Sequence, residues 1–85
     1  MTLQDAKEFL ENSHYEGLYD FLVFFFSPLA NTIEVREGHF REYSEGKMWF
    51  DDIWHKYNKM QIPYCGYING AFECGQGDIE TGKWK

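Results

Sequence analysis

Cysteine and proline are both scarce in this sequence, with two of each in 85 residues. Two cysteines cannot form the framework of several disulfides that holds many small secreted domains together, so an apolar core must supply most of the stability. The apolar run FLVFFF, at residues 21–26, is far shorter than the roughly 20 residues that span a bilayer. The first residues show neither the basic start nor the long apolar stretch of a secretory signal. We therefore expect a cytoplasmic protein without membrane contact.

Signatures of catalysis are also missing. The sequence contains no G-x-S-x-G, no H-E-x-x-H and no calcium-binding loop, and GQGDIETGK at residues 75–83 lacks the spacing and the Lys-Ser/Thr ending of a phosphate-binding loop. Asp51, Asp52 and His55 are close enough on one predicted helix to suggest acid–base chemistry. However, Asp51 and His55 fall on the outward face of that helix, where solvated charges are much commoner than catalytic ones. We predict no enzyme activity and no cofactor.

Basic residues are few, and the resulting negative charge is unevenly distributed. The chain has 14 Asp and Glu against 8 Lys and Arg, a net charge of −6. The whole excess lies in residues 1–45, and we expect eight of the acids there to attract a basic partner: Asp5, Glu8, Glu11, Glu16, Asp20, Glu34, Glu37 and Glu42. An anionic surface repels phosphate backbones, so we expect no direct nucleic-acid binding. The commoner alternative is a solvated surface that serves solubility alone.

Aromatic residues, in contrast, are abundant: 8 Phe, 6 Tyr and 3 Trp. The simplest interpretation is a small core rich in large rings. A domain of this size has limited interior room, however, so some rings are expected at the surface, where Tyr and Trp favour contacts with partners. Tyr15, Tyr64 and Trp84 lie furthest from the clear core patterns, and we predict them as candidate partner anchors.

The pattern of apolar residues predicts an α+β fold, a single domain of two to three helices packed on an antiparallel sheet of hairpins. A first helix is expected over 2–12, capped by Thr2. Residues 14–26 are apolar on nearly every side, which fits a buried helix or a buried strand, and we favour the helix. The clearest helix covers 45–60, where an apolar stripe recurs at helical spacing and predicts these core residues: Phe50, Ile53, Trp54 and Tyr57.

Two hairpins are predicted to form the sheet. In the first, over 32–43, a strand that alternates apolar and charged residues turns at Glu37-Gly38 into a second strand. The second covers 62–75 and turns at Asn69-Gly70, the strongest short hairpin signal, because both central residues of a type I′ turn need positive φ. The polar tail that follows can add a short strand.

The second hairpin places its two cysteines opposite each other. With a two-residue turn, Cys65 faces Cys74 at a non-hydrogen-bonded position, and both share a face with Tyr67 and Phe72. We favour two buried reduced thiols with a structural role. A cross-strand disulfide is the first alternative. A zinc site fits less well, because the cysteines lack metal-ligand spacing and the three histidines are scattered. A thiol catalyst fits less well too, because there is no C-x-x-C motif and no helix start follows either cysteine.

These observations favour a small acidic protein-binding module, an inhibitor that docks on a larger basic protein such as one that handles nucleic acid. Its gross composition is similar to that of immunity-type and phage counter-defence proteins, an analogy of composition and not of motif. The first alternative is a self-associating structural protein, a homodimer held by surface aromatics. A small thiol or metal protein ranks third, and we expect no metal site.

Overall fold

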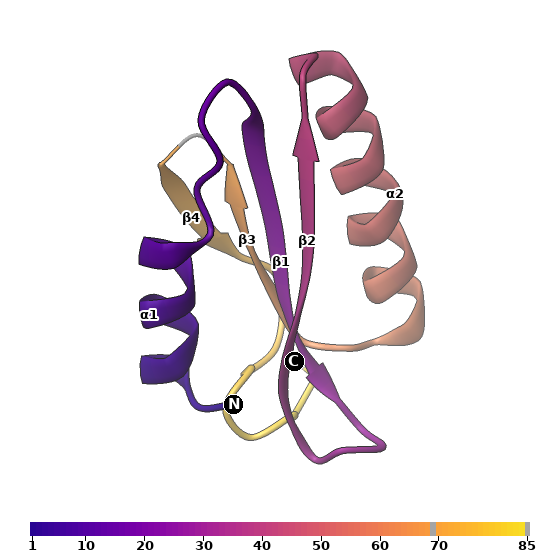
Figure 1. Ribbon diagram of the computed structural model, residues 1–85. Helices are drawn as coiled ribbons and strands as arrows, with labels where there is room; N and C mark the ends of the chain where they lie inside the picture. Colours follow the sequence, from indigo (N-terminus) through magenta and orange to yellow (C-terminus); the bar gives the residue numbers. More distant parts are fainter. Residues whose placement is uncertain (69, 85) are drawn as a thin grey trace.

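The computed structural model describes residues 1–68 and 70–84 and confirms the α+β fold. A four-stranded antiparallel sheet has the strand order β2-β1-β3-β4, and one helix covers each of its faces (Figure 1). The elements, in chain order, are α1 (Leu3–Asn12), β1 (Tyr19–Ser27), β2 (Thr32–Phe40), α2 (Tyr43–Met60), β3 (Tyr64–Ile68) and β4 (Ala71–Cys74).

The first helix forms as predicted, with a full capping box at its start. The Thr2 side chain accepts a hydrogen bond from the backbone N–H of Asp5, and the Asp5 carboxylate accepts one from the backbone N–H of Thr2. Two backbone donors that the helix itself leaves unpaired are thereby satisfied. The apolar side of α1 packs on the sheet through the buried Ala6 and its neighbours Leu3, Phe9 and Leu10.

The predicted helix over 14–26 is wrong, because most of this segment is the central strand β1. It pairs with β2 along one edge and with β3 along the other. Its side chains alternate between two cores, with Phe21 and Val23 facing α2 while Leu22 and Phe24 face α1. A strand buried on both faces reads as a continuous apolar run, which is why its periodicity resembled that of a buried helix.

The predicted hairpin over 32–43 is also wrong. β2 runs without a turn through Glu37 and Gly38, and its antiparallel partner is β1. The actual turn lies between Ser27 and Thr32, where Asn31 adopts a positive φ of 53° and donates its backbone N–H to the Ser27 carbonyl. Asn tolerates this left-handed conformation better than most residues.

The second helix and the second hairpin are confirmed. Phe50, Ile53 and Tyr57 of α2 are buried, whereas Trp54 is half-buried against the same core. The helix ends at Met60, and the residue that caps it, Gln61, adopts a positive φ of 56°.

In the hairpin, Cys65 pairs with Cys74 and Tyr67 with Phe72, in the predicted register. Gly70 has a positive φ of 83°, as a tight turn requires. The predicted turn position Asn69 lies outside the described residues.

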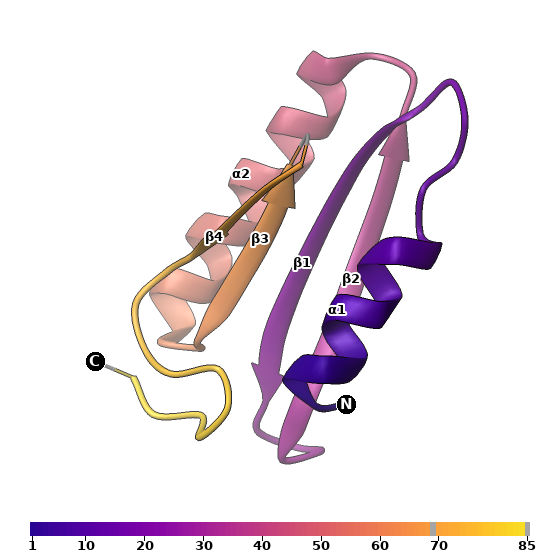
Figure 2. The ribbon, with the colours of Figure 1, turned by 90° about the vertical axis from the view of Figure 1, so that its left-hand side faces the viewer.

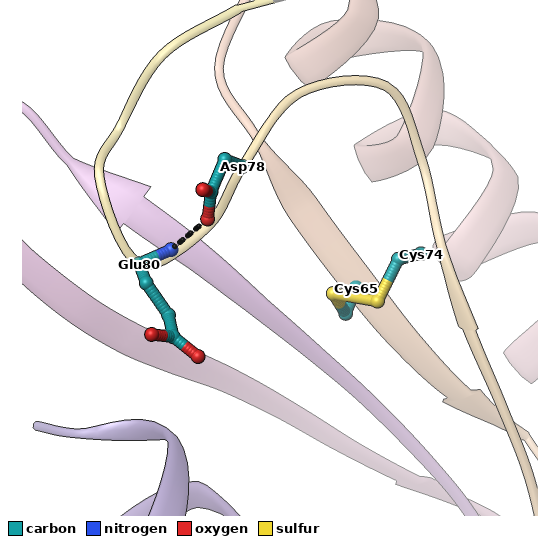
Figure 3. Close-up of a disulfide and its surroundings, with 4 residues drawn as sticks. All are labelled: Cys65, Cys74, Asp78 and Glu80. Carbon is teal, nitrogen blue, oxygen red and sulfur yellow. Dashed lines mark hydrogen bonds between the residues drawn. A yellow bond between two sulfur atoms is a disulfide. The ribbon is translucent and has the colours of Figure 1, made fainter.

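The tail after β4 is held to the protein instead of extending the sheet. Ile79 is buried in the core beneath α1, and an isolated bridge joins Asp78 to Lys83. The Asp78 carboxylate also accepts a hydrogen bond from the backbone N–H of Glu80, at 2.9 Å (Figure 3). One buried apolar side chain thus anchors the tail, which is mostly polar.

Candidate partner-binding surfaces

The outward side of α1 carries an acidic surface, which we call the α1 face and define by Asp5, Glu8 and Glu11. All three are exposed, and the helix contributes Lys7 as its one basic residue. The opposite side of the helix packs on the sheet, so these carboxylates face solvent. Figure 2 shows α1 on the side of the sheet turned toward the viewer. In α2 the three acidic and three basic residues balance. The two faces of the molecule therefore differ in charge.

The structure gathers only part of the predicted acidic set. Glu16 is exposed in the connection between α1 and β1, and Glu37 points to the α1 side of the sheet. Glu34 projects from the opposite side of β2, and Glu42 immediately precedes α2. The last two are therefore separated from the α1 face, a distribution that net charge along the sequence could not reveal.

Asp20 belongs to a cluster with histidines instead of standing as a free surface charge. Its side chain is only 11% exposed, and its two carboxylate oxygens contact His14 and His39. Burial acts to raise the pKa of Asp20, but the hydrogen bonds from His14 and His39 outweigh it and hold that pKa below its usual value. On its other side His39 contacts Glu37, with 2.9 Å between Nε2 and Oε1.

Of the three predicted aromatic anchors, only Tyr15 is well exposed. Its exposed fraction is 53%, and it lies just beyond the C-terminal end of α1. Tyr64 is a correction: it is 2% exposed, in the core beneath α2, and its hydroxyl donates to the Asn58 side chain. Its position on the α2-facing side of β3 buries it. Trp84 is half-buried in the tail.

The sequence did not indicate a groove between α2 and the hairpin β3–β4. This cavity of about 630 Å³, which we call the α2 groove, has Phe50 and Trp54 on its helix side and Ala71 and Glu73 on its hairpin side. Its floor depends on Gly66, because a Cβ there would lie 2.2 Å from the Phe50 ring. A glycine inside a strand is the one sequence signal for such a close approach. That α2 lies over Gly66 depends on the order of the strands in the sheet, which the sequence pattern does not predict.

The two cysteines form a disulfide, which corrects the expectation of reduced thiols (Figure 3). Their Cα atoms are 3.9 Å apart, and the cross-strand register brings the two side chains together on the same face. Cys65 is buried, whereas Cys74 lies on the exposed edge strand β4. Disulfides persist mainly in oxidising compartments, so this bond weighs against the predicted cytoplasmic location.

The described parts of the chain contain neither a group of metal ligands nor a membrane-spanning helix. Across residues 1–68 and 70–84, no group of three or more His, Cys, Asp and Glu side chains is arranged to hold a metal ion. Over the same residues, neither helix combines the length and the apolar character needed to cross a membrane.

Comparison with known proteins gives no relative. No family model, no curated protein and no solved structure matches the chain, so its function has to be inferred from its own residues.

Proposed function

We propose that this protein is a small binding module that docks through the α1 face on a basic surface of a larger protein and blocks that surface. The observation that supports this most is the charge difference between the two sides of the sheet. α1 presents Asp5, Glu8 and Glu11 against a single lysine, while the charges of α2 balance. Complementary charge accelerates encounter and excludes partners of like charge.

Tyr15 supplies the second part of a docking surface. Charges at the rim of an interface mainly set the association rate, whereas a buried aromatic side chain supplies much of the binding energy. Tyr15 is exposed beside the end of α1 and next to Glu16, so one partner can contact the ring and the carboxylates together. Its ring rests edge-on against His39, with 4.3 Å between centroids, which limits its freedom before binding.

Reversing two charges of the α1 face tests this proposal. E8K/E11K should reduce the association rate of the native partner roughly tenfold at low salt, because electrostatic steering contributes on that scale or more. Asp5 stays unchanged because it belongs to the capping box. The measurement is capture from a host lysate on the immobilised protein, quantified by mass spectrometry, followed by binding kinetics of the retained protein at several salt concentrations.

The matched control is E45K/D52K, which changes the net charge equally but on exposed positions of α2. We expect it to bind nearly as the unaltered protein does, and circular dichroism should show all three proteins folded. Equal loss of binding in both double variants would mean that the net charge of the protein, and not the α1 face, determines the association rate. A partner that binds E8K/E11K with unchanged rate and salt dependence would rule out docking through the α1 face.

Self-association is a second candidate function, favoured by the open edge of the sheet. β4 is a terminal strand whose residues are all exposed, including the ring of Phe72. Unpaired edge strands can pair with a second copy of the same chain.

If this function holds, light scattering should give a dimer mass that returns to the monomer in F72K. A monomer at every concentration would reject the homodimer and leave the α1 face as the remaining candidate. L29K serves as a control, because Leu29 is fully exposed in the turn between β1 and β2.

A further inference from the structure

His39 lies between two carboxylates on the α1 side of the sheet. Its Nδ1 is 2.7 Å from Oδ1 of Asp20, which is directly opposite on β1, and its Nε2 is 2.9 Å from Oε1 of Glu37, two residues away on β2. The side chains of His39 and Asp20 are only 15% and 11% exposed. The contact with Asp20 is therefore largely shielded from water, whereas the Glu37 side chain is 40% exposed. The pairing of β1 with β2 sets His39 and Asp20 opposite each other.

This arrangement demands a proton on each ring nitrogen. A neutral imidazole carries one N–H donor and one acceptor, whereas a carboxylate only accepts. If His39 were neutral, one of its nitrogens would direct a lone pair at a carboxylate oxygen. Only the imidazolium form donates to Asp20 and Glu37 at once. Burial by itself lowers the pKa of His39, but the hydrogen bonds to Glu37 and Asp20 and their negative charges outweigh this and raise it.

The same cluster holds the connection between α1 and β1. His14 contacts the second oxygen of Asp20, and the Tyr15 ring packs edge-on against His39. A small cavity of about 220 Å³ beside Asp20 is lined by His14 and, from β3, by Tyr67. Within residues 1–68 and 70–84, no lysine or arginine is ion-paired to these side chains. The charge that balances the carboxylates therefore comes from histidine.

We propose that Asp20, His39 and Glu37 form a proton-dependent latch that fixes the α1–β1 connection, residues 13–18, on the sheet. When His39 is protonated, it holds both carboxylates and supports the Tyr15 ring. When it loses its proton, one carboxylate contact becomes repulsive, and the connection opens with Tyr15 and His14. The latch is a property of the pure protein and does not depend on the partner proposed above.

The direction of the pH response follows from the two shifted groups. His39 has a raised pKa in the folded protein, so its contribution is complete below the ordinary histidine value of about 6.5 and is lost as the pH rises through its folded pKa. Asp20 has a lowered pKa, so its contribution is complete above the ordinary value of about 3.9 and is lost as the pH falls through its folded pKa. The latch is therefore closed in mildly acidic solution and opens toward alkaline pH.

Two independent NMR measurements on the full chain test the latch. The first is the titration midpoint of the His39 ring, compared with the ordinary histidine value of about 6.5. We expect the His39 midpoint to lie above that value. The second is the hydrogen-exchange protection factor of the Leu18 amide, which donates to the Tyr15 carbonyl at 3.2 Å. Linkage predicts how far the Leu18 protection factor falls between acidic and alkaline pH. The fall is about tenfold for each unit by which the folded pKa of His39 exceeds its ordinary value.

Two variants separate the latch from simple packing. E37Q keeps an acceptor but removes a charge from a partly exposed side chain, so it should stay folded, lower the His39 midpoint and shift the loss of Leu18 protection by the same amount. H39Q should make the protection of Leu18 low and abolish its loss toward alkaline pH. The latch is refuted if the His39 midpoint does not lie above the ordinary histidine value of about 6.5, or if Leu18 protection does not follow the His39 midpoint in the unaltered protein and in E37Q.

Discussion

Replacing Leu22 with alanine should lower the free energy of unfolding by about 2 to 5 kcal/mol, the cost of removing a buried leucine side chain where the surroundings cannot collapse. Leu22 is 0% exposed at the centre of β1, in the core beneath α1. It is enclosed by strands on both sides, because it pairs with Glu37 of β2 and Tyr67 of β3. Against a total stability on the order of 5 to 10 kcal/mol, this loss is expected to leave a large unfolded fraction.

The chain offers a matched control for this substitution. Leu29 is 101% exposed in the turn after β1, so Leu29→Ala removes the same atoms from water instead of from the core. Its effect should lie within about 0.5 kcal/mol. Urea denaturation followed by circular dichroism measures both values. Similar effects of the two substitutions would mean that β1 does not lie at the centre of the fold.

Reducing the bond between Cys65 and Cys74 should lower the free energy of unfolding by about 2 to 3 kcal/mol, because the disulfide closes a short loop and limits the unfolded chain. The change is measured as the shift in denaturation midpoint on adding a dithiol reductant. C65A/C74A should show the reduced stability in either condition, and the reductant should have no effect on it. A midpoint that does not move with reduction would contradict the predicted stabilisation.

The same double variant tests whether the two cysteines contribute to partner binding or only to stability. Neither cysteine belongs to the α1 face, so C65A/C74A should retain partner binding wherever it remains folded. A folded double variant that lost binding would assign the pair a direct role in the interface.

Local patterns predicted the elements whose signals are local. α1 was marked by Thr2 and Asp5, α2 by its apolar stripe, and the β3–β4 register by the Asn-Gly turn. β1 was not predictable in the same way, because a run buried on both faces has no distinguishing period. Only its pairing with strands on both edges, a contact between distant segments, decides that it is a strand.

The same reasoning explains what was predictable in the candidate sites. The acidity of α1 followed from helical spacing, so the α1 face was foreseeable once the helix was predicted. The proton-dependent latch was not foreseeable, because the sequence pattern favours a turn at Glu37 and Gly38. In the continuous strand β2, alternation places Glu37 and His39 on the same side of the sheet. Asp20, the third member of the latch, was on a segment expected to be helical. The cluster spans β1 and β2, so it could not be predicted while either segment was assigned to another structure.

The most direct measurement of the proposed function is a map of the partner's footprint by hydrogen–deuterium exchange of the protein, free and in complex with the captured protein. Docking through the α1 face predicts new protection in α1 and in residues 13–18 around Tyr15, with the α2 groove and β4 unchanged. Protection confined to α2 or to β4, with α1 exchanging as in the free protein, would contradict it.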